Sequence, residues 1–240
     1  QRQMCIRDRD LGVELRLNTR VDNLDDLFAE GFSAVLIAVG AHEGRKLPIA
    51  SVDLPGVMVN TVFLRDVRLG NPPPIAGKRV MVLGGGNVAV DVARTAVRLG
   101  AAEVHLACLE SREKMPAHPW EIEACEAEGI HIHPSRSFKR IVAAPPLSPP
   151  QAGGMQGGEC VGGLECLDVT FMEFTPDGRL TLETRPGSEH IIPCDVVIFS
   201  IGQRAGLGFI PESAGVGITR QQTIAVNPNT FAATRPGVFA

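Results

Sequence analysis

The sequence predicts an α/β fold in which a parallel sheet carries an antiparallel β insert. The first observation is a buried strand at 79–83 that passes through three glycines into a helix at 87–99 and on to a strand at 103–109. Two strands joined by one helix, with no room for a hairpin, form a βαβ unit and so a parallel pair. The second observation is a series of short β-like segments after Gly129. Such segments, with turn signals between them, favour antiparallel strands.

The residues before the βαβ unit predict further short elements. Residues 12–17 alternate apolar and polar, which indicates a short strand, and 24–32 form a short amphipathic stretch. Residues 34–40 are continuously apolar and stop at a glycine, as expected of a strand that is covered on both faces. Residues 41–60 are punctuated by glycine and proline and predict a loop. One or two helical turns are expected at 62–69.

A boundary is expected at Asn71-Pro72-Pro73-Pro74, because consecutive prolines continue neither a helix nor a central strand. In the helix that follows the glycines, four apolar residues spaced by three or four positions share one face. These are Val88, Val92, Ala96 and Leu99. Gly100 supplies the residue that ends this helix.

The second half of the chain predicts one helix at 121–128, closed by Gly129, and then antiparallel β structure. The expected antiparallel strands are 130–133, 138–142, 164–171 and 180–184. Asp177-Gly178 is a turn signal, and the proline- and glycine-rich residues 143–158 are assigned no structure. Residues 195–202 repeat the pattern of an apolar strand that ends in glycine.

Composition excludes several classes of protein. With 44% hydrophobic residues the 240-residue chain can bury a core, and a net charge of −4 with 5% aromatic residues argues against nucleic-acid binding. The longest apolar run has eight residues, against about 20 for a membrane helix, so we expect a soluble, cytoplasmic protein without membrane contact. Six cysteines without a CxxC pair fit a reducing compartment. Residues 1–10 resemble translated adapter sequence, with a native helix end as the alternative, and Cys5 is excluded from any site.

The motif that carries chemistry is Gly84-x-Gly86-x-x-Ala89, which follows a buried strand and opens a helix. Gly84 allows a tight turn, Gly86 lets a pyrophosphate approach the backbone, and the small Ala89 lets the helix pack close to the strand. The free N–H groups of the first helical turn then meet the phosphates. The motif predicts a Rossmann-like dinucleotide site. Its expected cofactor-binding residues are Gly84, Gly85, Gly86, Asn87, Val88 and Ala89.

Several motifs in the same order resemble the small subunit of glutamate synthase and related flavoproteins of the pyridine nucleotide-disulfide oxidoreductase superfamily. The similar stretches are 84–96, Ser111-Arg112 with Met115-Pro116-Ala117, 11–19, 63–67, 201–203, 223–226 and 235–240. The resemblance implies an NAD(P)-binding domain at 77–197. It also implies a partial FAD-binding segment at 11–76 and a return segment to that domain at 198–240.

The resemblance further implies the activity. Such proteins pass electrons from NAD(P)H through FAD to an iron–sulfur or large-subunit acceptor, and Val39-Gly40 and Ile201-Gly202 would lie near the flavin–nicotinamide junction. Members of the family carry an iron–sulfur domain and an FAD-binding GxGxxG upstream, and a Gly-Asp pair downstream, of the matching segment. We therefore expect these 240 residues to be an internal part of a larger oxidoreductase and to be inactive alone.

The choice of nicotinamide coenzyme depends on the end of the strand at 103–109. A carboxylate there accepts hydrogen bonds from ribose hydroxyls, whereas arginine binds a 2′-phosphate. NADPH-dependent members of the family tend to carry arginines where this chain has Leu109 and Glu110. Glu110 with Ser111 favours NADH, and Arg112 leaves NADPH open.

Other candidate residues favour structural roles. His131 and His133 share one strand face, but no third metal ligand of suitable spacing accompanies them, and the cysteines are isolated. No acid, base or nucleophile is named, because hydride transfer to a flavin needs alignment of two rings. Two alternatives stay open: a nicotinamide-binding regulatory module without turnover, which would need only one dinucleotide fold, and an ordinary dehydrogenase with a substrate domain.

Overall fold

A computed structural model of the chain describes residues 10–144, 159–175 and 179–240. The chain divides into two compact units, one of residues 1–40 with 205–240 and one of residues 41–204. Three features discussed above lie outside the described residues: the head before Asp10, most of the proline- and glycine-rich stretch, and the Asp177-Gly178 turn signal.

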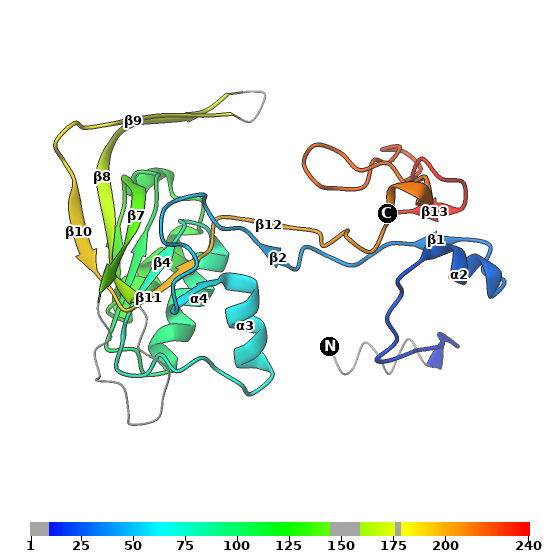
Figure 1. Cartoon of the computed structure of the whole chain (residues 1–240), viewed down its shortest axis with the longest axis horizontal. Helices are drawn as coiled ribbons and strands as arrows, with labels where there is room; N and C mark the ends of the chain where they lie inside the picture. Colours follow the sequence, from blue (N-terminus) through cyan, green and yellow to red (C-terminus); the bar gives the residue numbers. More distant parts are fainter. Residues whose placement is uncertain (1–9, 145–158, 176–178) are drawn as a thin grey trace. The chain divides into compact units, whose positions relative to one another are not determined.

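The larger unit is built on a five-stranded parallel sheet in the order β3-β11-β4-β5-β6. Its strands β4 and β11 are labelled in Figure 1. Its strands are β3 (Val57–Val59), β11 (Val196–Phe199), β4 (Arg79–Leu83), β5 (Glu103–Ala107) and β6 (His131–His133). All four neighbouring pairs run parallel. The predicted α/β class and the βαβ unit at its centre are confirmed.

Three helices cover one face of this sheet: α3 (Asn60–Arg68), α4 (Asn87–Arg98) and α5 (Pro119–Ala127). Strand side chains alternate between the two faces, so Val80 and Val82 of β4 pack against the helices. Of the face that the spacing predicts, Val92 and Ala96 enter the core and Leu99 packs against it, whereas Val88 lies outside the core and Ala89 is buried in its place. None of the described helices is long and apolar enough to cross a bilayer.

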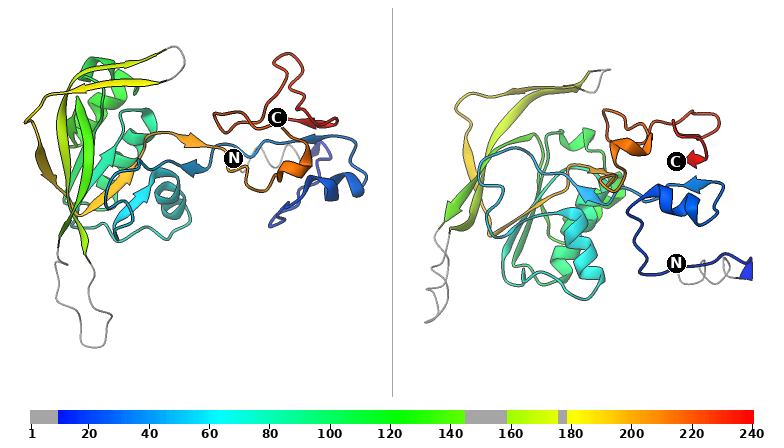
Figure 2. Two further views of the ribbon diagram at one scale, coloured as in Figure 1. Left: turned by 45° about the horizontal axis from the view of Figure 1, so that its top comes forward. Right: turned by 45° about the vertical axis from the view of Figure 1, so that its right-hand side comes forward.

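The other face of the parallel sheet is covered by antiparallel strands. These are β7 (Arg136–Ala144), β8 (Cys160–Phe174) and β10 (His190–Pro193), with β8 in the centre between β10 and β7. The fourth antiparallel strand, β9 (Leu180–Thr184), pairs with the far part of β8. Met81 and Leu83 of β4 pack there against Phe138 and Leu164. Figure 2 shows β8 continuing past the sheet and pairing with β9 as a projecting hairpin.

Two strands of the parallel sheet differ from the sequence expectation. Residues 131–133 were expected among the antiparallel strands, but β6 pairs parallel with β5, His105 opposite His131. Helix α5 supplies the crossover that a parallel pair needs. Residues 57–59 fall in the stretch expected to be a loop, and they form β3 because they add to the edge of β11.

The smaller unit contains α2 (Leu24–Ala29), β1 (Val35–Leu36), β13 (Val238–Phe239) and the 3-10 turn η2 (Glu212–Ala214). Residues 12–17, expected as a strand, are not in a strand and are exposed. The strand expected at 34–40 is also shorter, and its Leu36 is 68% exposed rather than covered on both faces. Leu36 is exposed because, within the described residues, β1 pairs with β13 and with no second strand.

The compact units divide at Gly40/Ala41 and Arg204/Ala205. In the larger unit β3 joins the parallel sheet and Phe63 of α3 enters its core. The domain boundaries at 76/77 and 197/198, which the resemblance implies, stay a prediction. The larger unit also contains a short antiparallel pair of β2 (Glu43–Gly44) with β12 (Gln203–Arg204). The 3-10 turn η1 (Arg112–Lys114) follows β5.

Three histidines cluster where β5 and β6 face the antiparallel strands. His105 Nδ1 lies 3.0 Å from His133 Nε2, and His105 Nε2 lies 3.3 Å from a Glu103 carboxylate oxygen. The His131 ring stacks on His105 with centroids 5.1 Å apart. Burial lowers the pKa of His133 to about 4. The nearby charges that lower this pKa further belong to His105, Arg136, His131 and His190.

We expect the free energy of unfolding to fall as the pH drops from about 6.5 to about 4. In this range the His133 ring binds a proton in the unfolded chain but stays neutral in the fold, because its pKa is lower there. Discounted for partial solvent exposure, the loss is about 1 to 2 kcal/mol. Denaturant unfolding at several pH values measures it. His133→Gln should flatten this part of the profile relative to the parent, and an unchanged slope would show that another group titrates.

Candidate functional site

The Gly84–Ala89 turn connects β4 to α4 at the carboxyl edge of the parallel sheet. The φ of Gly84 is +135°, and a Cβ at this position would lie 2.2 Å from the Ser200 carbonyl oxygen. This close approach requires glycine. A Cβ on Gly86 would meet nothing within 4 Å, so here the backbone faces open space. Ala89 is fully buried in the core beneath α4.

The turn is tied to the loop that follows β5. Ala117 N–H donates to the Gly85 carbonyl at 3.0 Å, and His118 N–H donates to Asn87 Oδ1 at 3.0 Å. The two motifs singled out from the sequence, the Gly-rich turn and Ser111 to Ala117, are therefore hydrogen-bonded to each other. Helix α4 begins within the first of these motifs, at Asn87.

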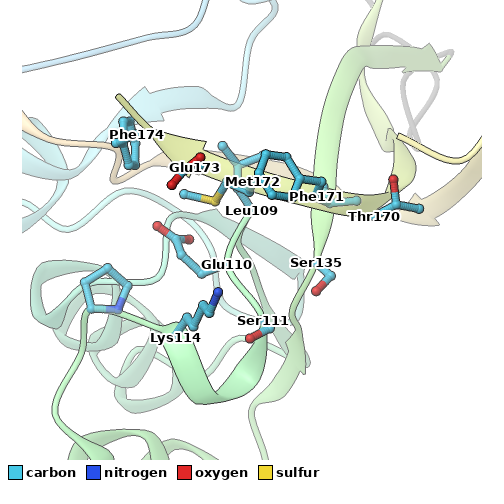
Figure 3. A pocket seen from close by; sticks show the side chains of 12 residues that line it. Leu109, Glu110, Ser111, Lys114, Ser135, Thr170, Phe171, Met172, Glu173 and Phe174 are labelled. Carbon is cyan, nitrogen blue, oxygen red and sulfur yellow. The ribbon is translucent and has the colours of Figure 1, made fainter. Parts of the chain in front are cut away.

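One pocket, of about 400 Å³, lies on the β5 side of the turn (Figure 3). Its floor comes from the end of β5 and its loop, with Glu110, Ser111 and Lys114, and from Ser135 after β6. Its other wall is the projecting part of β8, from Val169 to Phe174. Figure 3 shows the Met172 and Glu173 side chains facing Glu110 across the pocket.

The charged side chains in and near this pocket differ in whether they are free to contact a ligand. A Cβ on Gly85 would lie 3.3 Å from Glu110 Oε2, so the Glu110 carboxylate stands directly over the Gly-rich turn. Arg112 is instead paired with Glu126 of α5, at 2.9 Å, and does not line the pocket. Lys114 is the cation among the lining residues. Cys108 lies beneath Gly85, where burial raises the pKa of its thiol to about 12 and keeps it protonated.

A second pocket, of about 350 Å³, lies on the opposite side of the turn, over the ends of β11 and β3. Gly86, Asn87, Val88 and Gly202, all predicted from the sequence, line it together with Asn60, Pro116, Ser200 and Gln203. Asn60 Oδ1 and Ser200 Oγ, which belong to two of these residues, are buried and have no hydrogen-bond partner in the described part of the chain. Polar groups left in this state cost about 1 to 3 kcal/mol each.

The remaining predicted residues lie apart from these two pockets. Ile201 packs on the core between the parallel and antiparallel sheets. Val39 and Gly40 belong to the smaller unit, where they line an apolar pocket of about 270 Å³ with residues such as Leu207, Ile224 and Ala240.

Sequence reasoning missed Asn60, Ser200 and the β8 wall of the first pocket. Ser200 stands one residue before the predicted Ile201-Gly202 edge, so the rule that sites form where parallel strands end could have found it. Asn60 was missed because β3 was not recognised as a strand. The β8 wall carries no sequence signal, because it depends on a strand whose register against β9 shifts between Val169 and Phe171.

Comparison with known proteins places these features in context. Residues 8–152 match the family profile described as pyridine nucleotide-disulphide oxidoreductase. The chain is 40% identical over 238 residues to NADP(+)-dependent formate dehydrogenase subunit beta of Moorella thermoacetica, covering 96% of this chain and 31% of that protein. It is 31% identical over 246 residues to the glutamate synthase (NADPH) small chain of Escherichia coli, covering 96% of this chain and 49% of that protein. The resemblance to glutamate synthase small subunits is thereby confirmed.

Among solved structures, Mycobacterium tuberculosis FprA in complex with NADPH superposes with a TM-score of 0.66. That likeness covers 92% of this chain and 61% of the other at 18% identity, and it supports the fold. The chain spans about a third to a half of the two curated relatives compared here.

Proposed function

Because the chain belongs to the pyridine nucleotide-disulphide oxidoreductase family, we propose that it binds NAD(P)H along the carboxyl edge of its parallel sheet and supplies hydride to FAD. The observation that carries the proposal is the pair of pockets on either side of the Gly84–Ala89 turn. Together they offer room for two halves of a dinucleotide, with the open Gly86 backbone between them for the pyrophosphate.

The proposed orientation follows from the strand order. Glu110 at the end of β5 accepts hydrogen bonds from the adenosine ribose, so adenosine occupies the pocket roofed by β8. The N–H groups at the start of α4 bind the pyrophosphate. The nicotinamide half then extends to the pocket over β11 and β3.

FAD supplies a ring that accepts the nicotinamide hydride and releases electrons singly. The apolar pocket of the smaller unit fits part of such a ring, since Gly40 leaves open space beside it and Val39 and Leu207 offer apolar walls. We propose these residues as flavin contacts. We also propose that the electrons pass to an iron–sulfur or large-subunit acceptor, because the names of both relatives describe subunits of larger assemblies.

Calorimetric titration of the protein with NADH and with NADPH tests coenzyme binding, and failure of both to bind would refute the proposal. A second measurement distinguishes the regulatory module. In the full-length protein with FAD bound and oxygen excluded, NAD(P)H should bleach the visible flavin absorbance faster than it bleaches free FAD. Binding without accelerated bleaching would favour a module that senses nicotinamide without turnover.

Between the two coenzymes we propose a modest preference for NADH. The names of both relatives carry NADPH or NADP(+), which supports the phosphorylated form. In this chain, however, the Glu110 carboxylate stands over the turn while Arg112 is occupied by Glu126. Lys114 in the same pocket offsets part of the repulsion, so NADPH is weakened rather than excluded.

Glu110→Arg is expected to reverse this preference. A phosphate about 4 Å from the Glu110 carboxylate would be repelled by about 4 kcal/mol per unit charge at an effective dielectric of about 20. Solvent screening reduces this to about 1 to 2 kcal/mol, or about ten- to thirty-fold in affinity. Titration of both coenzymes against parent and variant measures it.

Glu113→Arg is the matched control, because it makes the same charge change on an exposed residue that does not line the pocket. It should shift the ratio of the two affinities much less. If the parent binds NADPH more tightly, or Glu110→Arg leaves the ratio unchanged, Glu110 does not contact the ribose.

A further inference from the structure

Strand β9 has the least protected edge among the described strands of the two larger sheets. Within the described residues β9 pairs with β8 alone, so one side of its backbone is left without a strand partner. Natural proteins protect such edges by keeping them short or by placing lysine or proline on them. The other edge strands follow this rule, since β3 and β6 have three residues each, β7 contains Lys139 and β10 ends at Pro193. The five residues of β9 include neither lysine nor proline.

The backbone groups that face this open edge follow from the pairing with β8. In an antiparallel pair, successive residues turn their N–H and C=O groups alternately toward the two sides of the strand. Thr175 N–H donates to the Arg179 carbonyl at 2.9 Å, and the Glu183 carbonyl accepts from Thr170 Oγ1 at 3.3 Å. Residues 179 and 183 therefore turn toward β8. The alternate residues turn toward the open edge: Leu180, Leu182 and Thr184.

The β8–β9 hairpin also has one apolar face. Directly opposite residues of an antiparallel pair project their side chains to the same face, and the register places Met172 opposite Leu182 and Phe174 opposite Leu180. Phe174 is 59% exposed and Leu180 is 40% exposed, so this face is uncovered toward its far end. A two-stranded ribbon is marginally stable alone, and further strands with an apolar face stabilise it.

The sequence of β9 is complementary to itself about Leu182. When two copies pair antiparallel with Leu182 at a two-fold axis, Leu180 lies opposite Thr184 of the second copy, and Thr181 lies opposite its Glu183. No charge then lies opposite a like charge. The outward N–H and C=O groups of residues 180, 182 and 184 all gain partners, and the apolar faces of the two hairpins join into one.

We propose that the edge of β9 binds a second copy of this chain, so that two β8–β9 hairpins form one continuous antiparallel sheet across a two-fold axis. Leu180, Thr181 and Glu183 are exposed, and the hairpin projects past the sheet (Figure 2), so a second copy can approach. Two five-residue strands bury less than the about 1,200 Å² of a stable interface, so we expect a dissociation constant on the order of 10 to 100 μM. The pairing does not depend on the proposed coenzyme site.

Sedimentation of the full-length protein at concentrations around this dissociation constant tests the pairing. Leu182→Lys places two like charges against each other at the two-fold axis and should raise the dissociation constant at least about ten-fold. Glu183→Lys is the matched control, because it puts lysine on the neighbouring residue, which turns toward β8 and lies opposite Thr181 of the second copy. This control should dimerise as the parent does.

Leu182→Cys adds a readout that depends on a gained link rather than on a loss. The Cα atoms of a hydrogen-bonded pair of opposite residues are about 5.5 Å apart, which a disulfide can span. Mild oxidation should therefore link two copies through position 182, and mass spectrometry of the peptides identifies the link. Glu183→Cys should link far less, because its counterpart in the second copy is not directly opposite.

Three results would overturn the proposal: a parent that sediments as a monomer, a Leu182→Lys variant that dimerises as tightly as the parent, or no link through position 182. Hydrogen exchange identifies another occupant of the edge. If amides at 180–184 are protected only when a different subunit is added, the edge binds that subunit and the pairing of two copies is refuted.

Discussion

Gly84→Ala is expected to lower the free energy of unfolding by about 3 to 5 kcal/mol, which is enough to unfold many domains. The added Cβ would lie 2.2 Å from the Ser200 carbonyl oxygen and 2.9 Å from its carbon, both backbone atoms that cannot turn away. The φ of +135° is also strained for any residue with a Cβ. The backbone is fixed on both sides, because Gly84 N–H donates to Ala107 and Ser200 N–H donates to Leu83.

Gly86→Ala, two residues away, is the matched control. Its Cβ would meet nothing within 4 Å, and its φ of −93° suits any residue, so the free energy of unfolding should change by less than about 0.5 kcal/mol. Coenzyme affinity should nevertheless fall about ten-fold or more, because the methyl group occupies the pyrophosphate path. Equal destabilisation by both substitutions would contradict this division of roles, in which Gly84 serves the fold and Gly86 the ligand.

Asp195→Ala is expected to lower the free energy of unfolding by about 2 to 3 kcal/mol. Its carboxylate accepts three hydrogen bonds from Arg79: from the backbone N–H at 2.9 Å, from Nε at 3.1 Å and from Nη2 at 2.7 Å. The pair fixes the start of β11 to the start of β4 across 116 residues of sequence. Denaturant unfolding measures the loss.

Glu43→Ala provides the comparison, because its ion pair with Arg204 is about half exposed on both sides and should contribute less than about 1 kcal/mol. The Arg79 hydrogen bonds hold the pKa of Asp195 below its usual range. The stability that this pair contributes is therefore present at neutral pH and lost as the solution is acidified through the lowered pKa. An Asp195→Ala loss no larger than that of Glu43→Ala would contradict this account.

The central βαβ unit was predictable because its signals are local. Arg79 to Gly100 contains a buried strand, a turn that requires glycine and a helix with one apolar face, and each signal lies within a few residues of the element that it specifies. The same locality made Glu110 and Ser111 predictable as residues near the turn, since they follow the next strand.

The elements that were missed depend on partners distant in sequence. Three residues at 57–59 become a strand only because β11, about 140 residues later, offers an edge. His131 to His133 alternate as an antiparallel strand would, and only the position of α5 makes β6 parallel. Asn60 was missed for the same reason, because its place in the second pocket depends on β3. The wall from Val169 to Phe174 lies where the register of β8 against β9 shifts, which composition does not reveal.

Hydrogen exchange with and without ligand tests the central claim most directly, because it locates the coenzyme along the sheet edge. With saturating ADP-ribose, amides at 84–90 and 109–116 should exchange more slowly, whereas those at 60–64 and 200–203 should not change. With NADH all four segments should be protected. Protection confined to residues outside these segments, or no change at 84–90 under conditions where calorimetry detects binding, would contradict the account.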